Sequence, residues 1–257
     1  MTTPPKLGAA SRLNFHSPLS IDRADRLTRD LAPRDLAPRD PAPRSPATVV
    51  DYGSGWGELL LRLLAAAPTA RGTGIDIHAP DLVRGRALAA ERGLADRTTF
   101  LESPAADHTE PADLVLSIGA YQAFGSIPEA LDALRGRVRP GGRLLFGAEV
   151  WDRTPTESEL AAMWPGMTAD SCLYLPDLVD AALAAGFRPL RVETATRAEW
   201  EEFESGYGAD VEEWLLDNPG HPEAADLRTK LDEHLSIWLR GTHGVFGFAY
   251  LTLGVPA

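Results

Sequence analysis

The stretch Thr48-Val49-Val50-Asp51-Tyr52-Gly53-Ser54-Gly55-Trp56-Gly57-Glu58 decides the fold of this chain. It begins with a short run rich in β-branched residues, which is typical of a buried strand. Glycines at alternate positions follow the run, and leucines at helical spacing follow the glycines over residues 58–67. A strand, a glycine turn and a helix in direct succession predict the first unit of a parallel sheet, in which ligands bind beyond the carboxyl ends of the strands.

The alternation of strand and helix continues toward the C-terminus. Short apolar runs predict strands at residues 73–77, 98–101, 113–117, 143–146 and 190–192. Helical spacing predicts helices at residues 81–92, 127–138 and 178–185. The alternation then stops, because the next predicted elements are helices at residues 197–205, 209–217 and 224–239 and a closing strand at 245–253. This order predicts an α/β fold with a mostly parallel sheet and a helical insertion, residues 193–243, before the last strand.

Residues 1–46 differ from the rest of the chain, which we assign to one domain, residues 47–257. Arg29-Asp30-Leu31-Ala32-Pro33 repeats as Arg34-Asp35-Leu36-Ala37-Pro38 and then decays. Because frequent prolines forbid a helix and alternating charges forbid a core, we predict a low-complexity, semi-extended spacer. Before it, Ser20 is placed to cap a short helix at residues 21–27. The segment around His16 is a candidate lid.

Composition and charge limit the classes of protein to which this chain can belong. The formal net charge is -12, and an acidic protein repels a nucleic-acid backbone. No apolar run reaches the length of a membrane span, and the N-terminus lacks the pattern of a signal peptide. The single cysteine, Cys172, excludes an internal disulfide and suits a reducing compartment. We therefore expect a cytoplasmic protein with a small-molecule substrate, no nucleic-acid or membrane partner, and an oligomeric state that the sequence leaves open.

The glycine turn distinguishes between ligand classes. A phosphate-binding loop ends in Gly-Lys-Ser/Thr, whereas Gly57 is followed by Glu58. The dinucleotide pattern G-x-G-x-x-G fails because the third glycine comes one residue early, and Glu58 would repel a pyrophosphate. A ligand with an ammonium group and no phosphate suits the turn better. Asp76, at the end of the second predicted strand, stands where carboxylates accept hydrogen bonds from ribose hydroxyls, with a turn or helix-capping role as the alternative.

Three motifs together resemble those of class I S-adenosylmethionine-dependent methyltransferases: Asp51 to Gly57, Gly74-Ile75-Asp76, and the turn from Arg139 to Leu145. The similarity spans residues 47–192 and the closing strand. It implies a Rossmann-like fold with a seven-stranded sheet whose last strand is antiparallel, and S-adenosylmethionine as the cofactor. The glycine turn would hold the methionine part of that cofactor, and Asp76 the ribose.

The resemblance also implies the set of residues that contact the cofactor. That set is Asp51, Gly53, Ser54, Gly55, Gly57, Asp76, Ile77, Ser103, Pro104, Ala105 and Ser117. One position departs from the family pattern, because Pro104 stands where an acidic residue often accepts from the adenine amino group. Ser103, Glu102 or the backbone would take over that contact.

The chemistry is expected beyond the fourth and fifth strands. Tyr121 and Gln122 follow the fourth strand and are candidates for contacting the substrate or the methyl donor. Glu149 and Trp151 follow the fifth, Glu149 as a base or a partner for a cationic acceptor. The remaining candidates are His243 as a base, Arg240 as a carboxylate clamp, and His16 from the lid segment.

The aromatic residues of the inserted helices are interpreted as core packing, since they are spaced mainly as a helical stripe. We expect the inserted helices to cover the substrate pocket. No cluster of residues has the spacing of metal ligands, so we predict no metal.

The leading hypothesis from the sequence is methyl transfer to an oxygen or nitrogen atom of a small molecule. A second hypothesis keeps the cofactor but changes the reaction to an intramolecular cyclisation that releases methylthioadenosine. A third is a non-catalytic protein that binds S-adenosylmethionine. A nicotinamide-dependent oxidoreductase is disfavoured by the glycine spacing. The acceptor and the general base stay open.

Overall fold

The computed structural model describes residues 3–32 and 47–257, so residues 33–46 of the predicted spacer lie outside the described residues. The strands are β1 Thr48–Tyr52, β2 Arg71–Asp76, β3 Thr98–Glu102, β4 Ala112–Ile118, β5 Val138–Trp151, β6 Arg188–Thr194 and β7 Phe246–Gly254. The α-helices are α1 Ile21–Leu31, α2 Glu58–Ala66, α3 Ala79–Glu91, α4 Ile127–Arg135, α5 Glu157–Ala162, α6 Leu175–Ala184, α7 Arg197–Tyr207, α8 Ala209–Asp217 and α9 Ala224–Ser236. Short 3₁₀ turns are η2 Ala95–Arg97, η3 Ala105–Asp107 and η4 Tyr121–Phe124, and η5 Ile237–Thr242 is a π-helix.

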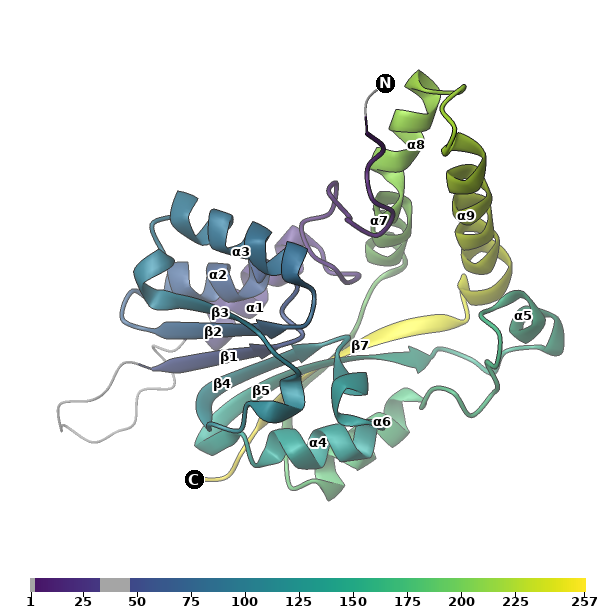
Figure 1. Ribbon diagram of the computed structural model, residues 1–257. Helices are drawn as coiled ribbons and strands as arrows, with labels where there is room; N and C mark the ends of the chain where they lie inside the picture. The colour runs from purple at the N-terminus through teal and green to yellow at the C-terminus, as the bar shows by residue number, and fades with distance from the viewer. Residues whose placement is uncertain (1–2, 33–46) are drawn as a thin grey trace. The chain divides into compact units, whose positions relative to one another are not determined.

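The seven strands form one sheet in the order β3-β2-β1-β4-β5-β7-β6 (Figure 1). β1 pairs in parallel with β2 and β4, β2 with β3, and β4 with β5, whereas β6 and β7 pair antiparallel. In Figure 1, α1, α2 and α3 cover one face of the sheet and α4 and α6 the other. This arrangement confirms the predicted Rossmann-like methyltransferase fold, with an antiparallel last strand.

Glycines on three elements make room for one aromatic ring in the core. A Cβ added at Gly57, Gly74 or Gly85 would lie 2.7, 2.9 and 2.7 Å from the ring of Phe100. Real side chains do not approach so closely, so these positions on the turn, β2 and α3 accept only glycine while Phe100 stays in place. The glycine turn therefore packs against the ring of Phe100 on β3.

The chain divides into two compact units. The first, called the sheet unit here, contains residues 20–32, 47–148, 176–194 and 249–257. The second, called the helical unit, contains residues 3–19, 149–175 and 195–248. The helical unit is therefore larger than the predicted insertion, because α5 and the N-terminal segment belong to it. Within that unit Leu13 and Phe15 are buried, and Ser11 donates to Asp210 over 2.5 Å.

Two local predictions were wrong for physical reasons. Residues 29–31, the start of the repeat, are not extended: α1 continues to Leu31, since Leu27 and Leu31 are both buried on one helical face. The helix predicted to reach residue 138 ends at Arg135, and β5 already begins at Val138, before Pro140-Gly141-Gly142. A shift in the pairing of β4 with β5 between Ala112 and Leu114 accommodates this early start. Each helix in the described part of the chain is too short or too polar to cross a bilayer.

Candidate functional site

The glycine turn after β1 is built from left-handed backbone conformations. Gly53, Gly55 and Gly57 have φ angles of +71°, +53° and +70°, which side-chain-bearing residues rarely adopt. The amides of Gly53 and Ser54 both donate to the carbonyl of Ile75 on β2, at 2.9 and 3.0 Å. The turn is therefore fixed to the neighbouring strand before α2 begins.

The two faces of this turn differ. A Cβ added at Gly53 would collide with the Cβ of Ala120, the residue just before η4. At Gly55 nothing lies within 4 Å of the same point. The turn is therefore closed against the β4 loop at Gly53 and open at Gly55, where a ligand can reach the backbone.

Asp76, at the end of β2, holds the open part of the turn. Its Oδ2 accepts from the Gly55 amide at 2.8 Å, and its Oδ1 accepts from the His78 amide at 2.9 Å. The turn role that the sequence left as an alternative is thus present. A carboxylate has about four acceptor sites, so Asp76 keeps capacity for further donors such as ribose hydroxyls.

Asp51, the last residue but one of β1, is a buried acid beside this arrangement. Only 6% of the surface of Asp51 is exposed. Burial, and secondarily the negative charge of Asp76, raises the pKa of Asp51 from 3.8 to about 7. Such a carboxyl exchanges a proton near neutral pH, and a cation placed next to it would stabilise its ionised form.

The start of α2 corrects one expectation. Glu58 is buried, and its two carboxylate oxygens accept from Arg62 Nε at 2.8 Å and Arg92 at 2.7 Å. The expected repulsion of a pyrophosphate by Glu58 is therefore weak, because the two guanidinium groups balance its charge. The glycine spacing remains the argument against a dinucleotide. On the other side of the turn, Arg84 stacks on Trp56 with its Cζ 3.8 Å from the ring centroid.

The residues predicted near the adenine lie at the ends of β2 and β3. Ile77 leaves 74% of its surface exposed, which is unusual for an aliphatic residue and provides an apolar face. The Ser103 amide donates to the Asp76 carbonyl at 3.1 Å, and Pro104 precedes η3, in which Ala105 is buried. Glu102 pairs in register with Asp76 and is exposed.

Other candidates of the sheet unit lie in β4 or directly after it. Ser117 is fully buried between β1 and β5, and its Oγ has no hydrogen-bond partner in the described part of the chain. Tyr121 and Gln122 are in η4, directly after the Ala120 that meets the glycine turn. The structure thus brings Tyr121 and Gln122 near the turn, and Gln122 is exposed.

Glu149 and Trp151 belong to the helical unit and have different surroundings. The Oε2 atom of Glu149 is buried without a hydrogen-bond partner among the described residues, and burial raises the pKa of this carboxyl. Trp151 is 2% exposed, donates its Nε1 proton to the Ala169 carbonyl at 2.8 Å and packs edge-on against Phe246. This places Trp151 in a hydrophobic core and not on an open surface.

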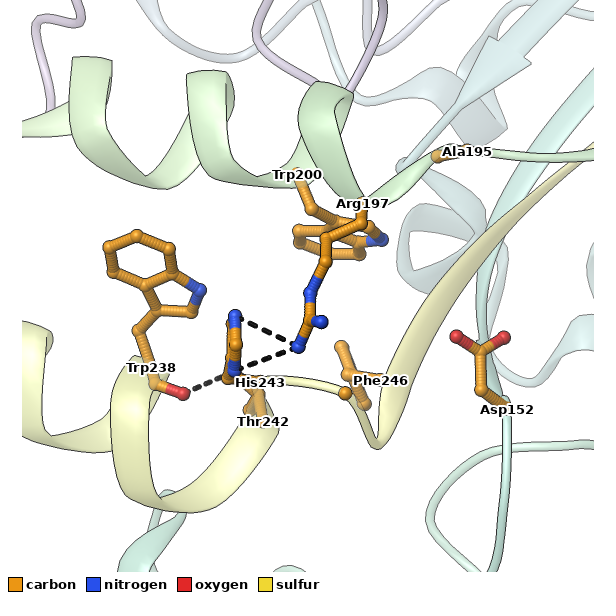
Figure 2. A pocket seen from close by; sticks show the side chains of 9 residues that line it. Asp152, Ala195, Arg197, Trp200, Trp238, Thr242, His243 and Phe246 are labelled. Atoms are coloured by element: carbon orange, nitrogen blue, oxygen red, sulfur yellow. Dashed lines mark hydrogen bonds between the residues drawn. The ribbon is translucent and has the colours of Figure 1, made fainter.

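The helical unit has a pocket of its own (Figure 2). It encloses about 450 Å³ of empty space, part of it open to solvent. Its lining residues are Asp152, Ala195, Arg197, Trp200, Trp238, Thr242, His243, Gly244 and Phe246. Figure 2 shows Trp238, His243 and Arg197 to one side and the carboxylate of Asp152 on the far side of Phe246.

The polar candidates in this unit are His16, Glu149, Arg240 and His243, and only one of them lines the pocket. His243 does so, and its ring nitrogens lie 3.4 and 3.3 Å from Arg197. Arg240 of η5 is exposed and donates to the Oγ atom of Ser236, the last residue of α9, at 3.0 Å. His16 stacks near Tyr207 with ring centroids 6.3 Å apart. Glu149 does not line the pocket either.

Sequence reasoning missed Asp152 and Arg197 and interpreted Trp200 and Trp238 as core residues. Asp152 directly follows the predicted pocket wall at 149–151, which was the available signal. Arg197 begins α7 next to the capping residue Thr196, and nothing local distinguishes it from a surface arginine. Among residues 3–32 and 47–257, no group of three or more His, Cys, Asp or Glu side chains is arranged to hold a metal.

The sequence profile of the family described as "Methyltransferase domain" matches residues 50–144, from the end of β1 into β5. YjhP of Escherichia coli K12, which carries no assigned activity in its name, is 28% identical over 207 residues, 80% of this chain and 83% of YjhP. The X-ray structure of YjhP matches with a TM-score of 0.81 at 24% identity over 98% of both chains.

Two further proteins bear on the chemistry. A methyltransferase from Geobacter sulfurreducens, crystallised with S-adenosyl-L-homocysteine, matches with a TM-score of 0.81 at 24% identity over 96% of this chain and 95% of that one. Aclacinomycin 10-hydroxylase RdmB of Streptomyces purpurascens is 39% identical over 118 residues, which are 43% of this chain and 29% of RdmB. The structural likenesses confirm the fold, and the match to RdmB covers a minor part of that protein.

Proposed function

We propose that this protein binds S-adenosylmethionine and transfers its methyl group to an oxygen or nitrogen atom of a small molecule. The match of residues 50–144 to the family described as "Methyltransferase domain" supports this proposal. One observation carries the proposal: the glycine turn is open at Gly55, is held by Asp76, and has the buried carboxyl of Asp51 beside it. This combination suits a ligand with a cation, a ribose and no phosphate.

The residues of the sheet unit suit the parts of that ligand. The ammonium of the methionine part would pair with Asp51, whose ionised form needs a cation. The ribose hydroxyls would donate to the remaining acceptor sites of Asp76, and the adenine would lie against the exposed side chain of Ile77. Ser103 and Ala105 would border the adenine edge, with backbone groups replacing the acid that Pro104 lacks.

When bound, S-adenosylmethionine supplies a methyl group already activated by the sulfonium. The chain's task is to bring the acceptor into line with that methyl group and to exclude water. The acceptor would receive this methyl group, and S-adenosylhomocysteine would be the second product. The acceptor's proton passes to a base or to water. Tyr121 and Gln122 in η4 are the proposed contacts near the transferred methyl group.

Isothermal titration calorimetry tests the cofactor assignment. We expect micromolar binding of S-adenosylmethionine and S-adenosylhomocysteine and none of NADH. Asp76→Ala and Gly55→Val should each abolish binding of the first two while circular dichroism shows a folded chain. Unchanged binding in both variants contradicts the assignment of the site.

A second candidate function keeps the cofactor without methyl transfer. It is favoured by the relative RdmB, which is named a hydroxylase and is 39% identical to this chain over 118 residues. Intramolecular cyclisation of the cofactor and purely structural binding belong to the same group of alternatives. Chromatography of the adenosyl product separates them: S-adenosylhomocysteine indicates methyl transfer, methylthioadenosine indicates cyclisation, and unchanged S-adenosylmethionine in the presence of a converted substrate indicates a non-methylating role.

A further inference from the structure

The pocket of the helical unit is lined by flat rings. Trp200 lies near Phe246 with ring centroids 6.1 Å apart and a tilt of 58°, and Trp238 meets His243 edge-on at 5.9 Å. Aromatic walls of this kind bind planar aromatic bodies by stacking and by edge contacts. The walls therefore indicate the shape of the ligand.

Two polar groups of the pocket have no hydrogen-bond partner in the part of the chain that the structure describes. The Nε1 atom of Trp200 is buried and has no acceptor among the described residues. The carboxylate of Asp152 forms no hydrogen bond or ion pair within residues 3–32 and 47–257, and it lies against Gly247, where a Cβ would collide with it. A buried donor without an acceptor is costly, so a ligand acceptor at Trp200 Nε1 gains affinity from that group. Asp152 is exposed, and its carboxylate can accept from a ligand donor in place of water. The pocket requires an acceptor near Trp200 and a donor near Asp152.

The positive charge in the pocket is already engaged. Arg197 Nε pairs with Glu201 Oε1 at 3.4 Å, and another guanidinium nitrogen contacts the ring of His243. The unit around the pocket is acidic, with thirteen Asp and Glu against three Lys and Arg from residue 193 to 233. An anionic ligand would compete with Glu201 and meet this negative charge. The charge balance therefore disfavours a carboxylate.

We propose that this pocket binds a neutral, planar aromatic molecule that carries a hydroxyl group, a phenol or a fused-ring analogue. The hydroxyl donates to Asp152, and an oxygen of the ligand accepts from Trp200 Nε1. The rings lie against Trp200, Trp238 and Phe246. The binding of this molecule does not rest on the proposed function.

Calorimetric titration of the full chain at pH 7.5 tests the proposal with four probes that share one ring system. They are 2-naphthol, 2-methoxynaphthalene, 2-naphthoate and 2-naphthylmethylamine. We expect 2-naphthol to bind at least tenfold more tightly than 2-methoxynaphthalene, because the ether lacks the donor for Asp152. Tighter binding of the naphthoate or of the amine would overturn the proposal in favour of an anion or a cation, and equal binding of naphthol and ether would overturn it outright.

Variants locate the contacts. Asp152→Ala should abolish the preference for naphthol over the ether, and Trp200→Phe should weaken both ligands severalfold while keeping an aromatic wall. Matched controls in the same unit but outside the pocket are Asp170→Ala and Trp214→Phe, which should leave all affinities unchanged. If Asp152→Ala does not fold, Gly247→Ala replaces it, because the new methyl group displaces the carboxylate. A preference that survives the displaced or deleted carboxylate overturns the proposal.

Titration of the same samples with S-adenosylmethionine separates the two proposals. Cofactor binding without a naphthol preference overturns the pocket assignment and leaves the proposed function standing. A naphthol preference without cofactor binding does the reverse.

Discussion

Replacing Asp51 by asparagine should stabilise the protein and weaken cofactor binding at the same time. The pKa of this buried carboxyl is about 7 in the folded chain, against an ordinary value of 3.8 that holds when the chain is unfolded. Between these two values the folded state binds more protons than the unfolded state. The free energy of unfolding therefore falls as pH rises from about 4 to 7, and it stays at the lower value above pH 7. Asparagine has nearly the same shape and no such penalty.

The size of the effect follows from the pKa shift. The folded and unfolded values differ by about 3 pKa units, and each unit corresponds to about 1.4 kcal/mol, so the ionised Asp51 costs about 4 kcal/mol at pH 8. At pH 5 only about 1 unit lies between the pH and the unfolded pKa, and the cost is between 1 and 2 kcal/mol. For a chain of this length 1 kcal/mol shifts Tm by about 2–4 °C. We expect Asp51→Asn to raise Tm by roughly 10 °C at pH 8 and by less than half of that at pH 5.

Scanning calorimetry at both pH values measures this difference, with Asp180→Asn on the exposed face of α6 as the control. The control should leave Tm unchanged at either pH. Asp51→Asn should also weaken S-adenosylmethionine binding at pH 8 by tenfold or more, because the amide cannot pair with an ammonium group. A gain in Tm of equal size at pH 5 and pH 8, or no gain at all, would refute the assignment of a raised pKa to Asp51.

Three further outcomes follow from the same geometry. S-Adenosylmethionine affinity should drop about tenfold between pH 8 and pH 6, because protonated Asp51 loses its attraction for the ammonium, and calorimetry in Asp51→Asn should show no such dependence. Gly55→Ala and Gly93→Ala both place a Cβ at positive φ in open space, so each should cost about 1–2 kcal/mol in denaturant unfolding, but only Gly55→Ala should lose cofactor binding. Gly85→Ala should destabilise the chain although alanine favours helices by about 1 kcal/mol, because its Cβ would lie 2.7 Å from Phe100; a stabilised variant would show that this ring moves freely.

The fold was predictable where the signals are local. The β-branched run ending in Asp51, the glycines and the leucines of α2 each specify one backbone conformation, and together they determine a strand, a turn and a helix. The early start of β5 was not predictable in this way. Pro140-Gly141-Gly142 is typical of a turn, and only pairing with the bulged start of β4, around Ala112, extends the strand across it. The same holds for α1, which continues to Leu31 because packing outweighs the composition of the repeat.

The cofactor site was more predictable than the pocket, because its residues occupy a few turns between neighbouring strands. Asp76 follows Gly55 by twenty-one residues, and parallel pairing of β1 with β2 is enough to bring them together. The pocket joins Asp152 after β5 with Arg197 on α7 and His243 before β7. No periodic pattern connects these positions. Their sequence neighbours give each of them an ordinary role as a loop or surface residue.

The energetic cost of Asp51 is itself an argument about function. A buried acid whose ionisation is opposed by burial and by Asp76 lowers stability at neutral pH, and asparagine or leucine would fit the end of β1 without that cost. Within the same unit, the buried acid Glu58 is offset by Arg62 and Arg92, so this chain does supply cations to buried carboxylates where stability requires them. Asp51 forms no ion pair with an arginine or a lysine among the described residues. A positively charged ligand at the open side of Gly55 would offset this cost. The proposed ammonium site therefore accounts for the destabilising position of Asp51.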